Sequence, residues 1–219
     1  MGSAAVLAAA VAGCADPGPA PAQSPAESSA ERGATPSAAA STPAPVTYTF
    51  PVKAKAKGKV TYGRYHHDYP AADIFAPCGS AVLAPTAGTI TQLSSKDTWE
   101  SDKNDGSNRG GLSFTLVTAD GVRYYGSHLQ QVEPAIRPGT RLASGDRIGE
   151  VGKVGHTGNA NGVCHLHYGI SPPCAKTGDW KVRRGVVWPA TFLTSWRKKG
   201  QKSPVATVQT WKKEHDCKA

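Results

Sequence analysis

Two histidines separated by one residue begin an apolar run in the segment CHLHYGI, residues 164–170. Alternate side chains of a β-strand point to the same face, so in a strand His165 and His167 point together while Leu166 points into the core. Two neighbouring imidazoles can bind a metal ion, or one can bind the ion while the other transfers protons. Two solvated histidines would give the same pattern, so other parts of the chain must decide.

An upstream segment, YHHDYPAADIFAP at 65–77, supplies further metal-binding side chains. His67 and Asp73 lie on either side of a turn built on Pro70, and residues 74–76 are typical of a buried strand that leaves the site. Two histidines and one carboxylate form a common catalytic zinc set, in which a fourth position stays open for water. A further histidine, His128, ends a predicted strand in YYGSHL.

Together these motifs resemble the LytM/lysostaphin-type zinc endopeptidases, which cut peptide bonds in bacterial peptidoglycan. The resemblance covers roughly residues 60–172, in order and with connecting text such as FAPCGSAVLAPTAGTI that also looks like the family. It implies one zinc ion per domain, bound by His67, Asp73 and His167. The two histidines of the family that do not bind zinc map to His128 and His165, which we expect to be catalytic.

The first motif departs from the family pattern. The family places three residues between its first histidine and its aspartate, whereas five residues separate His67 from Asp73. We interpret this as a two-residue expansion of the ligand loop, and His66 is the alternative first ligand. Asp68 is expected to be a turn residue or an outer neighbour of the site.

The resemblance also implies a mechanism. Zinc lowers the pKa of a bound water toward 7, and the water then attacks a peptide carbonyl. His128 and His165 would orient the water, accept its proton and deliver a proton to the leaving amine. Tyr62 or Tyr65 could donate to the developing oxyanion, although packing is the expected role of both, as it is for the tryptophans.

Short β-type runs separated by Gly, Pro, Asn and Asp occupy the chain from about residue 48. They predict a mainly β fold, an antiparallel sandwich or barrel-like core with little helix, similar to the duplicated-hybrid-motif fold of the LytM family. TADGV at 118–122 is typical of a hairpin turn, and PATFLTSW predicts a short helix. The peptidase domain is expected at 48–197, followed by a basic tail, 198–219, that either binds wall or membrane or is merely solvated.

The N-terminal segment indicates export. Residues 1–13 are small and apolar and end at Cys14, as in a lipoprotein signal peptide, although the usual basic start is missing. An Ala/Pro/Ser-rich tether, 14–47, is expected to stay disordered. We then expect lipidated Cys14 to anchor the chain on the outer face of the cytoplasmic membrane, with its domain in the cell envelope.

Four cysteines remain after Cys14, and an even number in an exported chain indicates two disulfides. Asp73 and His167 both lie at the expected metal site. The strand after Asp73 and the strand after His167 are both taken to run away from this site. Cys78 and Cys174 would then emerge at the same end of the sheet and pair. Cys164 would pair with Cys217 or stay free.

The formal net charge of +9 and the pI of about 9.4 favour a polyanionic partner. No nucleic-acid-binding motif is recognisable, and nucleic acid is not an expected partner. The family resemblance implies peptidoglycan as the partner, and a monomer is the expected state. Other hypotheses are a catalytically inactive LytM-like domain that activates another wall hydrolase, a scaffold without chemistry, and a peptidase of secreted proteins. The scissile bond, Gly-Gly or a cross-link of D-amino acids, is left open by the sequence.

Overall fold

The computed structural model describes residues 18, 45–100, 102–103, 106–156, 162–175 and 179–219. The chain divides into Met1–Pro43 and Ala44–Ala219, and every described strand and helix belongs to the second unit. The expected signal segment, Cys14 and nearly all of the tether lie outside the described residues.

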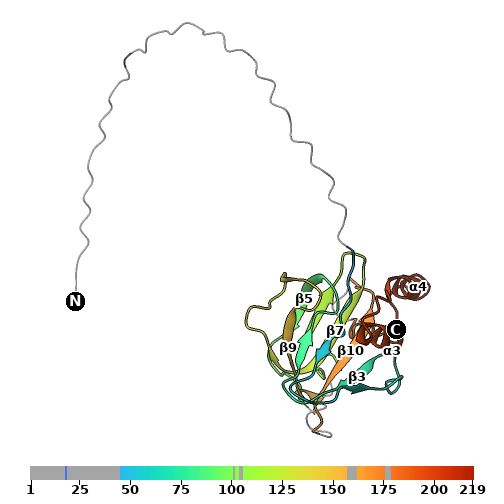
Figure 1. Cartoon of the computed structure of the whole chain (residues 1–219). Coiled ribbons are helices and arrows are strands. Elements are labelled where there is room, and N and C mark those ends of the chain that lie inside the picture. The colour runs from blue at the N-terminus through green and yellow to red at the C-terminus, as the bar shows by residue number, and fades with distance from the viewer. Residues whose placement is uncertain (1–17, 19–44, 101, 104–105, 157–161, 176–178) are drawn as a thin grey trace, which may run out of the picture. The chain divides into compact units, whose positions relative to one another are not determined.

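The described part of the second unit holds ten strands in one sheet and three helices near its C-terminal end (Figure 1). The strands are β1 Val52–Lys53, β2 Thr61–Tyr62, β3 Ala72–Phe75, β4 Ala81–Leu83, β5 Gly88–Ser94, β6 Leu112–Val117, β7 Arg123–Val132, β8 Arg141–Leu142, β9 Arg147–Val151 and β10 His165–Ser171; the helices are α2 Trp180–Arg183, α3 Ala190–Arg197 and α4 Val205–His215. All strand pairs are antiparallel, and the sheet curls, which confirms the predicted fold class.

The long strand β7 organises the sheet because it pairs with three other strands. Its first half, from Arg123 to Ser127, pairs with β10 on one side and β6 on the other. Its second half pairs with β9, beginning at Leu129 opposite Val151. The residue between the two halves is His128, so this histidine lies at the point where β7 changes partners.

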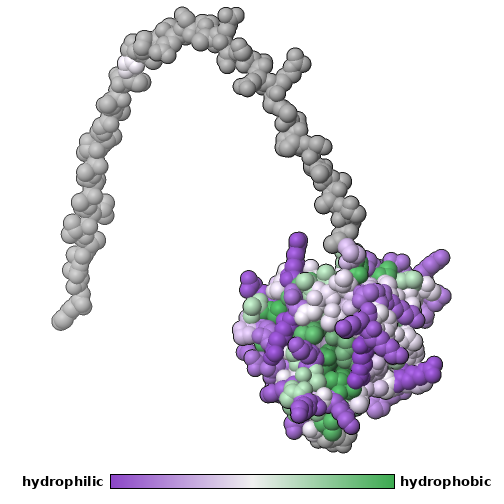
Figure 2. Space-filling view, in the orientation of Figure 1, coloured by the Kyte–Doolittle hydropathy of each residue, from purple (hydrophilic) through white to green (hydrophobic). Residues whose placement is uncertain are grey.

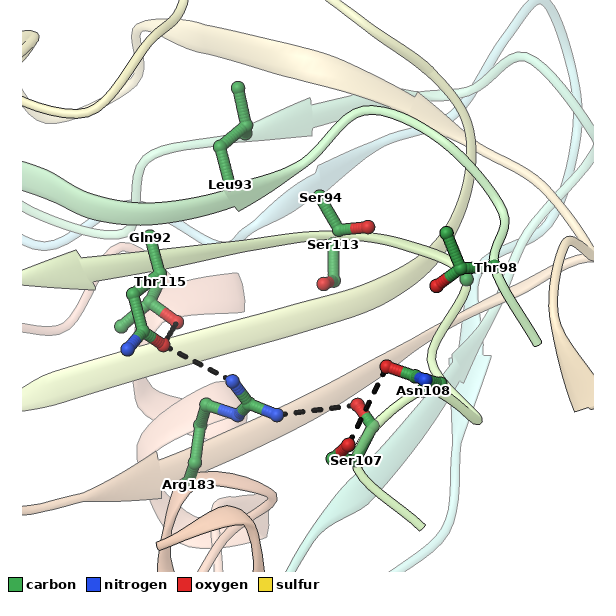
Figure 3. A pocket seen from close by; sticks show the side chains of 10 residues that line it. Gln92, Leu93, Ser94, Thr98, Ser107, Asn108, Ser113, Thr115 and Arg183 are labelled. Atoms are coloured by element: carbon green, nitrogen blue, oxygen red, sulfur yellow. Dashed lines mark hydrogen bonds between the residues drawn. The ribbon is translucent and has the colours of Figure 1, made fainter. Parts of the chain in front are cut away.

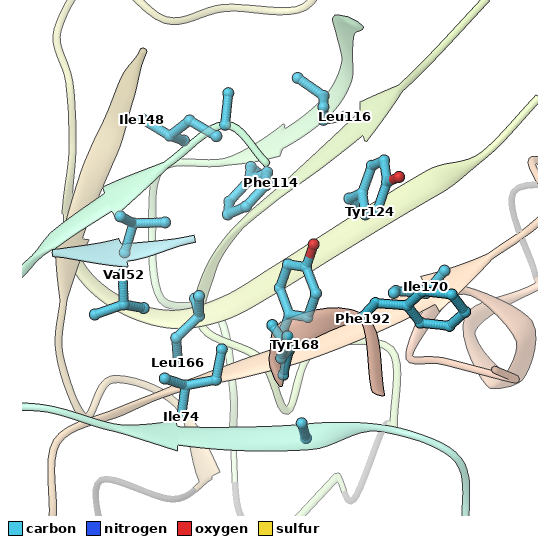
Figure 4. Close-up of a cluster of buried hydrophobic side chains, with 14 of the residues drawn as sticks. Val52, Ile74, Phe114, Leu116, Tyr124, Ile148, Leu166, Tyr168, Ile170 and Phe192 are labelled. Carbon is cyan, nitrogen blue, oxygen red and sulfur yellow. The ribbon is translucent and has the colours of Figure 1, made fainter. Parts of the chain in front are cut away.

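One face of the sheet carries the hydrophobic core (Figure 4). Leu166, Tyr168 and Ile170 of β10 are fully buried there, together with Ile74 of β3 and Tyr124 of β7. Because side chains alternate along a strand, the residues between them point to the opposite face. The predicted orientation of Leu166 toward the core is therefore confirmed, and with it the common face of His165 and His167.

The predicted hairpin turn is also confirmed. The backbone N–H of Thr118 donates to the carbonyl of Val122 over 2.9 Å, and Gly121 has a φ of 79°. That left-handed conformation is one that glycine adopts without steric cost. The turn connects β6 directly to β7 and so sets the register of the central hairpin.

The helices differ from the sequence prediction in one respect. Helix α3 lies where a short helix was expected, and its Trp196 packs against Tyr124 and stacks on Tyr48 at 5.2 Å between ring centroids. Residues 198–219, expected to be a basic tail, contain α4, which lies with α3 beyond β10 and β3 in Figure 1. Val208 of α4 is fully buried in the core, so this segment is part of the folded unit.

The predicted disulfides were wrong. The structure pairs Cys78 with Cys164 and Cys174 with Cys217. The prediction placed the ends of β3 and β10 at the same edge, whereas the two strands are antiparallel. Cys78, just after β3, therefore lies beside Cys164, just before β10, and Cys174 is left to bond Cys217 beyond α4.

Polar and charged side chains cover most of the face seen in Figure 2, with small apolar areas between them. No helix among the described residues is long and apolar enough to span a bilayer.

Replacing both cysteines of the Cys78–Cys164 bond with serine should lower the free energy of unfolding by about 2–5 kcal/mol, because the crosslink restricts the unfolded chain. This bond closes a separation of 86 residues, against 43 for Cys174–Cys217, so the second double variant should lose less. Urea denaturation of the two double variants measures both losses. A larger loss for Cys174→Ser/Cys217→Ser would contradict the prediction, as would a non-reducing peptide map with other pairs.

Candidate metal centre

Asp73 and His167 face each other across neighbouring strands. The register of β3 against β10 pairs them directly, and His167 Nδ1 lies 3.1 Å from Asp73 Oδ1. Both side chains project from the face of the sheet opposite the hydrophobic core. Strand geometry alone therefore brings together two of the three predicted ligands, which are 94 residues apart in the sequence.

The third member of the cluster is His66. Its Nε2 atom lies 3.6 Å from Asp73 Oδ2, and its ring centroid lies 5.0 Å from that of His167. One donor atom from each of His66, Asp73 and His167 falls within 4.8 Å of the other two. Two imidazole nitrogens and a carboxylate oxygen in this arrangement match the donor set of a catalytic zinc site.

His67, the first choice from the sequence, lies outside this cluster. Its side chain is exposed, and its ring packs edge-on against His66 at 4.5 Å between centroids. The side chain of His66, in contrast, is only 7% exposed and faces Asp73. The geometry thus favours the alternative, in which six residues rather than five separate the first histidine from Asp73.

The cluster fits a cation because its donor atoms face one another. His66 Nε2 lies 3.6 Å from one carboxylate oxygen of Asp73, and His167 Nδ1 lies 3.1 Å from the other. Asp73 carries a negative charge at neutral pH: burial alone would raise its pKa, but the neighbouring imidazoles of His167 and His66 lower it to about 2. An ionised carboxylate beside two imidazole nitrogens is a donor set that a zinc ion accepts.

A backbone carbonyl fixes the orientation of His167. Its Nε2–H donates to the carbonyl oxygen of Arg184 over 3.0 Å, which leaves Nδ1 as the nitrogen that faces Asp73. Such an outer hydrogen bond sets the tautomer of a metal-binding histidine and makes the ring a better ligand. The backbone reaches this position because Gly169 of β10 has no side chain: a Cβ there would lie 2.3 Å from the Arg184 oxygen.

A buried ion pair anchors the helical turn that leads to this carbonyl. Arg123, at the start of β7, donates to Ser171 Oγ over 2.9 Å and to Asp179 Oδ2 over 2.7 Å. Asp179 immediately precedes α2, and Arg184 immediately follows it. The ion pair therefore ties the start of this short helical turn to β7, and the backbone N–H of Arg184 donates to the carbonyl of Trp180 over 2.9 Å.

His128 and His165 form a second pair of imidazoles beside the cluster. Their ring centroids lie 4.9 Å apart, and His128 lies 6.2 Å from His167. The Nδ1 atom of each lies near a backbone carbonyl, that of Val154 for His128 at 2.9 Å and that of Val163 for His165 at 3.0 Å. When Nδ1–H donates to these carbonyls, Nε2 is the basic nitrogen of each ring, as proton transfer requires.

His128 has an unusual backbone conformation. Its φ is 67°, a region that side chains other than glycine rarely occupy. The register of β6 against β7 shifts at the same place, between Leu112 and Ser113. The strained backbone is thus a bulge that turns the imidazole toward the cluster, as bulges beside active sites commonly do.

Burial keeps two of these histidines, His66 and His128, uncharged. Burial lowers the pKa of His128 to about 3, with further contributions from His167 and His165. Burial lowers the pKa of His66 to about 4, against the opposing effect of Asp73. Both rings are therefore neutral at pH 7 and can act as ligand or proton acceptor.

The sequence analysis missed two residues, Tyr69 and Arg184. The guanidinium of Arg184 lies 3.6 Å from the centre of the Tyr69 ring and 4.7 Å from that of Trp180. Tyr69 in turn lies 4.4 Å from His66, and burial raises its pKa to about 12, so it keeps its proton. No sequence motif predicts this contact between Arg184 and Tyr69, because Arg184 follows His167 by 17 residues and Tyr69 lies in the expanded loop.

Tyr62 and Tyr65, which the sequence offered as possible oxyanion donors, were expected to pack instead. Tyr62 bonds Thr194 through its hydroxyl and packs against Phe50, which supports a packing role. Tyr65 is 64% exposed, so the expected role in packing the core is not observed for it.

A separate polar depression of about 230 Å³ lies over β5 and β6 (Figure 3). Arg183 donates across it to Gln92 Oε1 and to the carbonyl of Ser107, over 3.2 and 3.3 Å. None of the site residues predicted from the sequence lines it.

The model of peptidase family M23 matches residues 67–178. Among solved structures, the chain is similar to a lytM protein from Ruminococcus gnavus, at 20% identity and a TM-score of 0.51, over 72% of this chain and 63% of that one. It is also similar to the catalytic domain of lysostaphin from Staphylococcus simulans, at 21% identity and a TM-score of 0.45, over 64% of this chain and 92% of that domain. No curated protein matches the sequence.

Substituting Gly169 with alanine should displace the Arg184 carbonyl from His167, because the new methyl group would collide with it. We expect zinc affinity to fall by about 10–100-fold, the usual effect of losing an outer hydrogen bond to a ligand. Gly139→Ala is the matched control, since a methyl group there meets open space, although its positive φ of 92° adds local strain. Unchanged zinc affinity in Gly169→Ala, measured by chelator competition, would contradict this role of the carbonyl.

The metal-free chain should lose stability as the pH falls from about 6.5 to about 4. His66 and His128 stay neutral in the folded chain over this range, whereas the same side chains in the unfolded chain take up protons. Denaturant titrations in excess chelator at several pH values measure the free energy of unfolding. His128→Asn should reduce the pH dependence, and an equally steep dependence in that variant would argue against a neutral, buried His128.

Proposed function

Since the chain belongs to peptidase family M23, we propose that it is a zinc-dependent endopeptidase that hydrolyses peptide bonds of bacterial peptidoglycan. One observation carries the proposal: His66, Asp73 and His167 converge on one point, and a second pair of histidines lies beside them. Peptidases that use one zinc ion combine such a three-ligand set with proton-transferring side chains.

We assign zinc to His66 Nε2, Asp73 and His167 Nδ1, with His66 in place of His67. When bound, the ion would polarise the peptide carbonyl and lower the pKa of a water molecule. Asp73 and the two imidazoles hold the cation by charge and geometry, and the carbonyl of Arg184 keeps His167 correctly turned.

His128 and His165 are the proposed catalytic residues. Each presents Nε2 as its basic nitrogen, so one ring can accept the proton of the attacking water and, as the imidazolium, deliver that proton to the leaving amine, while the other ring orients the water. Tyr69, which keeps its proton and packs beside His66, is the proposed hydrogen-bond donor to the developing oxyanion.

The proposed substrate and location rest on the sequence. The family resemblance supports peptidoglycan stem peptides or cross-links as the substrate. The apolar segment that ends at Cys14 supports a lipid anchor in the cell envelope, from which the Pro-rich tether would let the domain reach the wall.

The experiment digests purified peptidoglycan with the zinc-loaded chain and identifies new peptide ends by mass spectrometry, with His128→Ala as the inactive control. New ends that vanish in the variant would support the proposal and name the bond. No cleavage by a chain that binds zinc stoichiometrically would favour a latent enzyme or another wall chemistry. A chain that neither cleaves nor binds zinc would favour the inactive binding domain.

His66→Ala should abolish stoichiometric zinc binding, whereas His67→Ala should retain it, because only His66 turns its ring nitrogen toward Asp73. The two neighbouring histidines are a matched pair: the substitution is the same, and both side chains line the same depression. Zinc content after dialysis, with titration calorimetry, measures the difference. Loss of zinc in His67→Ala with retention in His66→Ala would overturn the ligand assignment.

A further inference from the structure

Exposed large hydrophobic side chains gather around the metal centre. Five such residues occur among the described residues, and four of them, Tyr65, Phe75, Val163 and Trp188, lie at or next to its opening. Tyr65 and Phe75 line the depression of about 300 Å³ that contains His66 and Asp73. Apolar side chains that stay exposed in one place usually mark a binding surface.

Two further hollows continue this depression along the edge of the sheet. One, of about 330 Å³, shares Phe75 with it and runs past Val163 and the Cys78–Cys164 bond. The other, of about 460 Å³, shares Gly63 with it and runs between β2 and α3. The three hollows thus adjoin one another from α3, past the metal centre, to the Cys78–Cys164 bond.

Tyr65 and Trp188 stand together beside the centre. Their rings meet edge to face at 5.1 Å between centroids and are 64% and 39% exposed. The backbone under Trp188 is held firmly, since Val187 is buried and bridges to Ile170 of β10. Tyr65 immediately precedes the proposed ligand His66. The pair is thus a fixed aromatic surface that contributes little to the core.

Polar groups surround this aromatic pair. The guanidinium of Arg64 lies 5.5 Å from the centre of the Tyr65 ring. Thr191 and Thr194 of α3 line the adjoining hollow, together with Tyr62, whose hydroxyl bonds Thr194. A ligand that fits here has an apolar face for the rings and hydroxyl or amide groups at its margin.

We propose that Tyr65 and Trp188 form a platform that binds a pyranose ring of the glycan strand next to the peptide that is cut. A pyranose has a C–H face that packs on an aromatic ring, and a rim of hydroxyl and acetamido groups for Arg64 and the threonines. The occupant rests on the proposed function, because the polymer that carries both peptide and sugar is peptidoglycan. A short aliphatic side chain would not match an open surface of this size and polarity.

The test measures binding of peptide-free glycan strands, prepared by removing the stem peptides enzymatically, to the full chain in excess chelator. We expect Tyr65→Leu and Trp188→Leu each to weaken binding by about tenfold, the contribution of one aromatic contact. Tyr65→Phe and Trp188→Tyr keep an aromatic face and should bind as the parent does. Both side chains lie outside the hydrophobic core, so all four variants should remain folded, and thermal unfolding checks this.

Three outcomes would overturn the platform: no binding of peptide-free glycan, equal binding by the leucine variants, or equal losses in the leucine and the aromatic variants. Because the chelated chain cannot hydrolyse peptides, these results are independent of the proposed activity. Cleavage of cross-links without glycan binding would leave the peptidase and remove the platform. Glycan binding that needs the two rings, in a chain that cuts no peptide, would support the platform and contradict the peptidase.

Discussion

The pairing of β3 with β10 determines where the chemistry of this molecule is placed. Asp73 lies opposite His167 only because Ile74 and Leu166, the next residues along, are opposite each other in the core. A slip of one residue would move the polar pair into the core and the apolar pair into the groove. The burial of apolar side chains on one face of the sheet thus fixes the polar cluster on the other.

The remaining parts of the centre attach to this pair from three directions. The loop before β3 supplies His66, the bend of β7 supplies His128, and the turn after α2 supplies the carbonyl that orients His167. Two of these contacts hold the backbone in unusual positions: the positive φ of His128 and the close approach at Gly169. A non-glycine residue in the left-handed region costs on the order of 1 kcal/mol, which the surrounding sheet must offset.

Much of this arrangement could be predicted from the sequence, because it depends on local periodicity. The alternation in HLHYGI placed His165 and His167 on one face, and the run after Asp73 indicated a strand. The choice between His66 and His67 could not be made, because a loop with an irregular backbone has no periodicity to show which ring turns inward. Tyr69 and Arg184 were missed for the same reason, since their stack exists only once distant loops have met.

The disulfides and the C-terminal helix show a second limit. Pairing Cys78 with Cys174 assumed a common strand direction, which the spacing of residues along the chain does not reveal. The lysines of α4 suggested a solvated tail, but Val208 and the bond at Cys217 join that segment to the core. The basic composition of such a segment predicts that part of it is exposed, but it does not show whether the segment packs against the core.

The most direct test of the centre is the anomalous diffraction of zinc in crystals of the zinc-loaded chain. The account predicts one peak with His66 Nε2, an oxygen of Asp73 and His167 Nδ1 at about 2.0–2.2 Å, the usual range for such ligands. A peak coordinated by His67 with His66 turned away, or no peak between β3 and β10, would contradict it.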